Sequence, residues 1–206
     1  MTDKRIHRYI FLLAGMLLLM GMVPGHALAL QNRNVGAERP AYPESIPSPG
    51  RGSDPLTRVT APGIFSLPVV QQGKAGAVHV SAAPETITEF ELAAKYGNVG
   101  LLAHNYLAGE NFFKLKVGQK VHLNYGENRV ETYVVTEILR YQALSPHSPY
   151  SDFRKPGSTE IISAGQMFDT VYRGAHHLTF QTCIEQDGSS SWGRLFVIAV
   201  PLNSTQ

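Results

Sequence analysis

The only cysteine in the chain, Cys183, ends a strand-like run of residues, 178–183. Eleven residues later, Arg194 begins a second apolar run, 194–198. A thiol can attack an acyl carbon as a nucleophile, and a guanidinium can stabilise the oxyanion that then forms. A histidine would complete such a site by carrying protons to and from the reacting groups. The chain has eight histidines. The strands and loops that carry them have to indicate which one could act as the proton carrier.

Several of these histidines have a simpler explanation. His79 and His122 alternate with apolar neighbours on strand-like segments and are expected to face solvent. His177 has the same strand parity as Cys183, but six residues of extended chain, roughly 20 Å, separate the two. That separation is too long for direct proton transfer. Neither Cys-x-x-Cys nor His-x-x-x-His occurs in the sequence, so we expect no metal site.

The bulk composition restricts the class of protein. The 206 residues suffice for one ordinary domain with extensions. The formal net charge of +2 arises at the N-terminus, where Lys4, Arg5 and Arg8 stand against Asp3. From Leu30 onward, fifteen basic residues face fifteen acidic ones. This balance gives no reason to expect nucleic acid as a partner.

The first 29 residues have the organisation of an export signal. Basic residues precede an apolar stretch, 9–23, and Pro24-Gly25 breaks it before the small-x-small pattern of 27–29. The stretch is shorter than the ~20 residues that a membrane-spanning helix needs. We expect 1–29 to be a signal peptide or an N-terminal membrane anchor, and the sequence leaves open which of the two it is.

The remainder divides into two parts. Residues 30–62 are rich in Pro, Gly and Ser and lack apolar periodicity, which predicts a disordered tether. From Gly63 onward apolar residues recur in short strand-like runs, and 63–206 is predicted to be a single β-barrel domain. The absence of a second cysteine excludes an internal disulfide in this domain.

Within 63–206, short strands outnumber helices. The turn 126–129 joins two strands as a hairpin, and Ser163 is expected to cap a helix that ends at Tyr172. Many short strands with few helices predict a mainly β fold, a closed barrel of about eight strands with a few short helices. Predicted strands are 66–70, 77–80, 99–104, 120–125, 131–139 and the two that carry Cys183 and Arg194; predicted helices are 86–96 and 163–172.

Four segments of the chain resemble segments of the sortase family, and they occur in the same order as in sortases. Thr179-Phe180-Gln181-Thr182-Cys183 is similar to the sortase signature Thr-Leu-x-Thr-Cys, with Phe180 in place of Leu. Arg194 lies on the next strand, as the essential arginine of sortases does. The segment 100–105 resembles the strand that ends in the catalytic histidine, and 113–121 resembles the segment that follows, with Gln119 where Asp is usual. The resemblance covers about 140 residues and implies a sortase-type barrel.

The resemblance implies roles for four residues. Cys183 would be the nucleophile, Arg194 the oxyanion donor and His104 the acid and base. Thr182 matches the family threonine that helps to hold the substrate, although a plain strand position explains it too. Two further substrate contacts are predicted from position alone, at Trp192, by strand parity with Arg194, and at His147, in the loop 144–159. For Trp192 a role in packing is the simpler explanation. No cofactor and no metal are implied.

The implied function is that of a cysteine transpeptidase outside the cytoplasmic membrane. Sortases cleave a C-terminal sorting signal of an exported protein, Leu-Pro-x-Thr-Gly or a similar pentapeptide, between Thr and Gly. They transfer the acyl group through a thioester to an amine on the cell wall or on another protein. Two alternatives stay open at this point: a cysteine protease or hydrolase of the same fold with water as acceptor, and a non-catalytic extracellular β-module. The protein would be secreted or tethered to the outer face of the membrane by its N-terminal segment.

Overall fold

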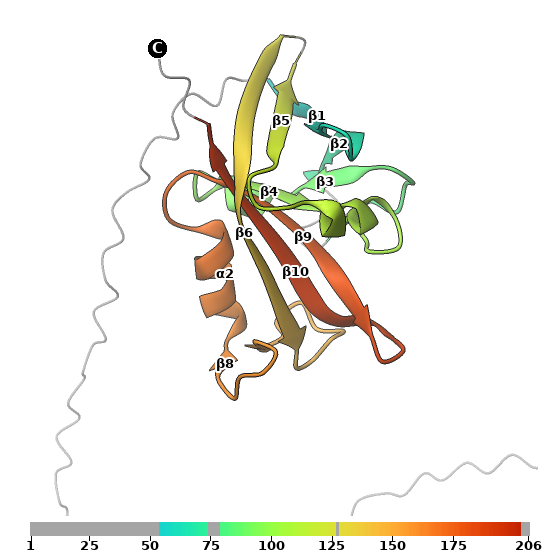
Figure 1. Cartoon of the computed structure of the whole chain (residues 1–206), viewed down its shortest axis with the longest axis vertical. Coiled ribbons are helices and arrows are strands. Elements are labelled where there is room, and N and C mark those ends of the chain that lie inside the picture. Colours follow the sequence, from blue (N-terminus) through green and yellow to red (C-terminus); the bar gives the residue numbers. More distant parts are fainter. Residues whose placement is uncertain (1–53, 74–78, 127, 203–206) are drawn as a thin grey trace, which may run out of the picture. The chain divides into compact units, whose positions relative to one another are not determined.

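The computed structural model describes residues 54–73, 79–126 and 128–202, and these form a single sheet with short helices around it (Figure 1). The predicted export signal and most of the predicted tether lie outside the described residues. The strands are β1 (Leu56–Ala61), β2 (Phe65–Gln71), β3 (Ile87–Glu89), β4 (Val99–Leu102), β5 (Lys120–Tyr125), β6 (Arg129–Ala143), β7 (Phe153–Arg154), β8 (Ile161–Ile162), β9 (Leu178–Gln186) and β10 (Ser189–Pro201).

Eight of the ten strands close into a barrel. They are hydrogen-bonded in the order β10-β9-β4-β3-β2-β1-β5-β6, and β6 pairs back with β10. Closure of the ring leaves no open edge among these strands. β7 and β8 extend the sheet beyond the end of β6. The predicted mainly β fold with a closed barrel of about eight strands is confirmed.

The barrel interior is filled by side chains from alternate positions of the strands. Phe180 of β9 is fully buried there, and its ring lies 4.9 Å from that of Phe112 and 6.3 Å from that of Phe65, measured between centroids. Leu195 and Val197 of β10 belong to the same interior cluster. The Phe180 that departs from the sortase signature is therefore a core residue, because an aromatic ring fits between these two others.

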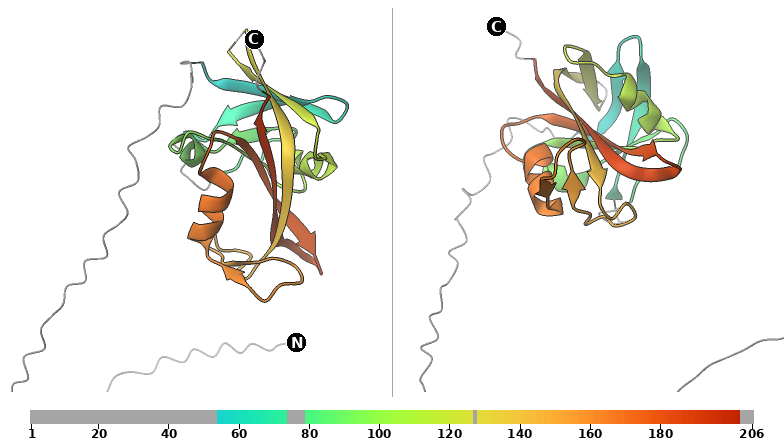
Figure 2. Two further views of the ribbon diagram at one scale, coloured as in Figure 1. Left: turned by 60° about the vertical axis from the view of Figure 1, so that its left-hand side comes forward. Right: turned by 60° about the horizontal axis from the view of Figure 1, so that its bottom comes forward.

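A second apolar cluster covers the outer face of the barrel. The helix α2 (Ala164–Tyr172) buries Met167, Val171 and Tyr172 against residues of β6 and β10, among them Phe196. Figure 2 shows this helix beside the long strands. Its first turn closes as predicted. Ser163 Oγ accepts from the Gln166 amide at 3.2 Å, and the Gln166 side chain accepts from the Ser163 amide at 2.9 Å.

Two further helices are short. The helix α1 (Glu91–Ala94) follows β3, and the 3₁₀ helix η2 (Ala108–Lys114) follows β4. No helix of the described residues is long and apolar enough to cross a membrane. The predicted helix 163–172 is confirmed by α2, with Ser163 as its N-cap. The predicted hairpin 120–139 is confirmed by the pairing of β5 with β6.

Three expectations about elements need correction. The predicted helix 86–96 is instead the strand β3 followed by the short helix α1, because Ile87 and Thr88 are buried between β2 and β4 and complete the ring there. The strand β1 falls within the predicted tether 30–62, so the barrel begins before Gly63. Of the predicted strand 77–80, residues 77–78 lie outside the described residues, and His79 and Val80 are not in a strand.

Candidate active site

Cys183 and Arg194 are direct neighbours across two strands. In the antiparallel pair of β9 and β10, Arg194 lies opposite Cys183, so their β-carbons are about 4.5–5.5 Å apart. Side chains alternate along each strand, and Phe180 and Leu195 point into the barrel. Cys183 and Arg194 therefore lie on the outer face, where both are half-buried. The thiol is free.

His104 follows β4, the strand on the other side of β9. β4 runs parallel to β9 with Leu102 opposite Gln181, and the Ala103 amide donates to the Gln181 carbonyl at 3.3 Å. The pairing of β4 with β9 ends at Leu102, and His104 follows two residues later, on the side of β9 that lies opposite to β10. Neighbouring strands lie about 4.8 Å apart. β9, which carries Cys183, thus lies between β4, which leads to His104, and β10, which carries Arg194. The approach of the His104 ring to Cys183 stays a prediction.

Hydrogen bonds hold the main chain at His104. The amides of Leu107 and Gly109 both donate to the His104 carbonyl at 3.0 Å. The Thr182 hydroxyl donates to the Ala103 carbonyl at 2.8 Å and is buried with its residue. Thr182 therefore ties β4 to β9 beside the nucleophile, and its contact with substrate stays a prediction.

Gly109 is required by this close packing. A β-carbon at position 109 would touch Thr182 Oγ1 and would lie 2.7 Å from the His104 carbonyl oxygen and 2.9 Å from that of Ala103. Two of these three atoms belong to the main chain, which cannot give way without moving His104.

We expect Gly109→Ala to lower the free energy of unfolding by about 1–3 kcal/mol and to reduce turnover of any substrate that needs His104. Gly165→Ala, in α2, is the matched control, since its β-carbon would meet nothing nearer than Ser163 Oγ at 4.0 Å. Urea unfolding of both variants measures the difference. Equal stability of the two would contradict the packing argument.

The guanidinium of Arg194 is held by main-chain carbonyls. Nη1 donates to the carbonyls of Ser191 and Gly193 at 3.0 and 2.9 Å, and Nη2 donates to that of Pro146 at 3.1 Å. A guanidinium has five N–H donors. Nε–H and one Nη2–H have no acceptor among the described residues. The three anchors therefore leave two N–H groups of Arg194 unused among the described residues.

The loop after β6 lies against Arg194. It is braced internally, since the Ser145 amide donates to Ser151 Oγ at 2.9 Å. Ser145, Pro146, His147 and Ser148 line an open depression of about 400 Å³. His147 is exposed there, beside the carbonyl that Arg194 binds. Its predicted contact with substrate stays a prediction.

Trp192 lies near this region but outside the regular ladder. The pairing of β9 with β10 shifts register between Ser189 and Gly193, so no partner across the strands is defined for Trp192. Parity with Arg194 therefore does not assign its face. The Trp192 side chain is half-buried, and its role stays a prediction.

The rival histidines are engaged elsewhere. His177 is 7% exposed, and its two ring nitrogens lie 2.7 and 2.9 Å from the carbonyls of Ala175 and Val171. His122 Nδ1 lies 3.0 Å from Thr132 Oγ1, and His79 is exposed on a segment outside the ring. None of the three neighbours Cys183 in the strand pairings.

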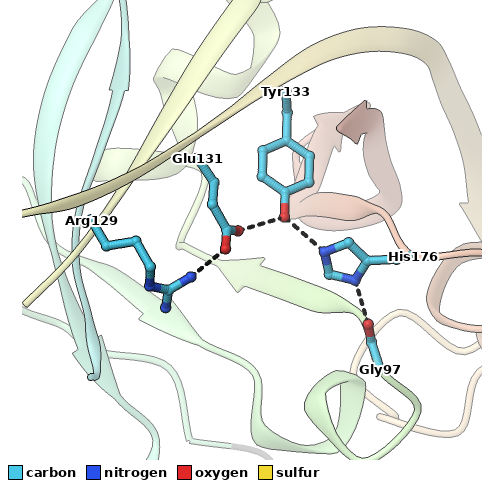
Figure 3. Close-up of polar contacts among 5 residues, drawn as sticks. All are labelled: Gly97, Arg129, Glu131, Tyr133 and His176. Atoms are coloured by element: carbon cyan, nitrogen blue, oxygen red, sulfur yellow. Dashed lines mark hydrogen bonds and ion pairs between the residues drawn. The ribbon is translucent and has the colours of Figure 1, made fainter. Parts of the chain in front are cut away.

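His176 belongs to a separate chain of polar contacts with Gly97, Tyr133, Glu131 and Arg129 (Figure 3). Its Nδ1 lies 2.5 Å from the Gly97 carbonyl, and its Nε2 lies 2.8 Å from the Tyr133 hydroxyl. Tyr133 donates to Glu131 at 3.0 Å, and Glu131 forms an ion pair with Arg129. This chain links β6 to the segments before β4 and β9, so His176 has a structural partner at each nitrogen.

A buried tyrosine braces β9 close to the nucleophile. Tyr172 of α2 donates to Gln181 Oε1 at 2.6 Å, two residues before Cys183. Burial raises the pKa of Tyr172. The phenol therefore stays protonated and acts only as a donor to Gln181.

Three features beside the site were not expected from the sequence. They are the ring of Tyr106, which stacks on His104, the close approach of Gly109, and the Pro146 carbonyl on Arg194. No periodicity distinguishes these positions, because all three lie in loops or at the start of a 3₁₀ helix. No group of three or more His, Cys, Asp or Glu side chains is placed to hold a metal in the part of the chain that the structure describes.

Comparison with known proteins gives matches among solved structures. No protein-family model matches the sequence, and no curated protein matches it. Sortase C from Clostridium perfringens SM101 is 16% identical over 73% of this chain and 71% of that chain, with a TM-score of 0.46. A Clostridium perfringens sortase D5 transpeptidase is 17% identical over 72% and 79%, with a TM-score of 0.47. Sortase A from Listeria monocytogenes is 15% identical over 72% and 87%, with a TM-score of 0.47. The family that this chain resembles, in its sequence motifs and among these solved structures, is the sortase family.

Proposed function

We propose that this protein is a sortase-like cysteine transpeptidase. The observation that carries the proposal is the pairing of Arg194 opposite Cys183 in a β9 that lies between β10 and β4, the strand that leads to His104. A nucleophile with a proton carrier on one side and an oxyanion donor on the other is the arrangement that acyl transfer requires.

The first half of the reaction would form a thioester. Cys183 would react as the thiolate, the nucleophilic form of the thiol, with His104 in its protonated form. The sulfur attacks the carbonyl carbon of the scissile peptide bond, and the carbonyl oxygen takes up negative charge. Nε–H and the remaining Nη2–H of Arg194 are the donors available to that oxygen. The tetrahedral intermediate then collapses, the C–N bond breaks, and His104 protonates the departing amine.

The second half would resolve the thioester. An incoming amine attacks the acyl carbon, and His104 takes its proton. Arg194 again stabilises the oxyanion, and the C–S bond breaks to release the Cys183 sulfur. The same three residues would serve if water were the acceptor, so the residues alone do not distinguish a transpeptidase from a hydrolase.

The substrate would be another exported protein with a C-terminal sorting signal similar to Leu-Pro-x-Thr-Gly, cleaved between Thr and Gly. The acceptor would be an amine on the cell wall or on a second protein. This fits the export signal expected in residues 1–29, which would place the enzyme outside the cytoplasmic membrane, secreted or tethered.

The test is to incubate the protein with a library of pentapeptides based on Leu-Pro-x-Thr-Gly and to identify products by mass spectrometry, with and without triglycine. We expect a peptide acyl group on the tryptic fragment that contains Cys183, and a triglycine adduct when the amine is present. A hydrolysed product in both conditions would make the protein a hydrolase. Absence of any acyl-Cys183 would refute the catalytic function and favour a non-catalytic β-module.

A further inference from the structure

Tyr106 is an exposed aromatic residue whose ring nonetheless has a defined partner. Its ring stacks on that of His104, with 5.3 Å between centroids and an angle of 22° between planes. Yet 67% of Tyr106 is exposed to solvent. Burial in a core therefore does not account for its placement, and the stack on His104 is its one ring contact among the described residues.

The main chain around Tyr106 is anchored on both sides. Before it, Asn105 Nδ2 donates to the Ser190 carbonyl of β10 at 3.0 Å. After it, the Leu107 amide donates to the His104 carbonyl at 3.0 Å. Tyr106 thus lies in a tight turn that is fixed to the strand of Arg194 and to His104 itself. A turn held in this way limits where the phenol ring can go.

We propose that Tyr106 is a positioning residue that acts through His104, and this role rests on the proposed acyl transfer. A half-exposed imidazole on a residue that follows a strand can rotate about two side-chain bonds. A near-parallel aromatic ring covers one face of the imidazole and favours a single ring plane. The nitrogens then stay in that plane, at the edge of the ring, where proton transfer takes place.

The role predicts a loss that depends on the leaving group. When a peptide amide is cleaved, the departing amine needs a proton from His104. When a p-nitrophenyl ester of the same peptide is cleaved, the phenolate leaves without one. A change that acts through the orientation of His104 should therefore slow acylation of Cys183 by the amide and leave acylation by the ester unchanged.

The experiment compares Tyr106→Leu and Tyr106→Phe in the full chain, with acylation of Cys183 followed by rapid quenching and mass spectrometry. We expect Tyr106→Leu to slow acylation by the amide about tenfold, with the ester rate within about twofold of wild type. Tyr106→Phe keeps the stack and should keep both rates. Phe113→Ala, which removes a partly exposed aromatic residue of η2, serves as the control and should keep both rates as well.

The outcomes separate the two proposals. Equal losses on amide and ester, or an unchanged amide rate in Tyr106→Leu, would overturn the role of Tyr106 and leave the acyl-transfer function standing. A wild-type protein that neither substrate acylates would overturn the proposed function itself. Melting temperatures of all variants show whether a slower acylation results from unfolding. If Tyr106→Phe slowed acylation by the amide as much as Tyr106→Leu does, the stacking role would also be refuted.

Discussion

Cys183→Ala is expected to abolish acyl transfer, with a loss of at least about 10⁴-fold in turnover. The variant keeps Arg194 and His104 but has no atom that can form the thioester. Its fold should persist, because Cys183 is half-buried on the outer face and alanine leaves the strand pairing intact. The measurement is peptide cleavage with and without triglycine, together with thermal unfolding of the same samples.

Cys183→Ser is the companion variant. A hydroxyl of similar size preserves the shape of the site but is a far weaker nucleophile than a thiol without a strong base beside it. We expect it to be as inactive as Cys183→Ala while binding the peptide substrate. Substantial cleavage by either variant would mean that the chemistry lies elsewhere.

Arg194→Lys is expected to cause the next largest loss, about 10²–10³-fold in kcat with little change in KM. The guanidinium spends three donors on the carbonyls of Ser191, Gly193 and Pro146 and keeps two for the oxyanion. An ammonium has three donors around a single atom. It therefore cannot bind these carbonyls and also donate two hydrogen bonds to an oxyanion. Lysine keeps the positive charge, so a loss of kcat would result from the changed geometry of the hydrogen-bond donors and not from a loss of charge.

Arg58→Lys provides the matched control. Arg58 of β1 also donates to a main-chain carbonyl, that of Ser66 at 3.1 Å, but it is exposed on the barrel surface. The control should keep kcat and KM at the values of the wild type. A similar kcat for Arg194→Lys and wild type would remove Arg194 from the catalytic step.

The sequence was most informative where the signal is local. Ser163 predicts the start of α2, because a helix cap involves only neighbouring residues, and the structure adds Gln166 as its partner in a capping box. The hairpin of β5 and β6 was likewise predictable, since alternation and a short polar turn lie next to each other in the chain. The helix 86–96 was wrong for the opposite reason. Ile87 and Thr88 form β3 because they pair with β2 on one side and with β4 on the other. Both partner strands are separate segments of the chain, so the local sequence does not indicate this pairing.

By itself the sequence determined the mainly β fold, because alternation is a property of each strand alone, and its resemblance to sortases indicated Cys183, Arg194 and His104 as candidates. Only the tertiary structure decided how they meet. Cys183 and Arg194 are opposed because β9 and β10 pair in one register and no other. The residue before His104, Ala103, is tied to the residue before Cys183 by the hydrogen bond from Thr182, 79 residues further along the chain. The close approach of Thr182 to Gly109 and the Pro146 anchor of Arg194 also arise from contacts between distant segments. Alternation along one strand carries no information about the strand beside it.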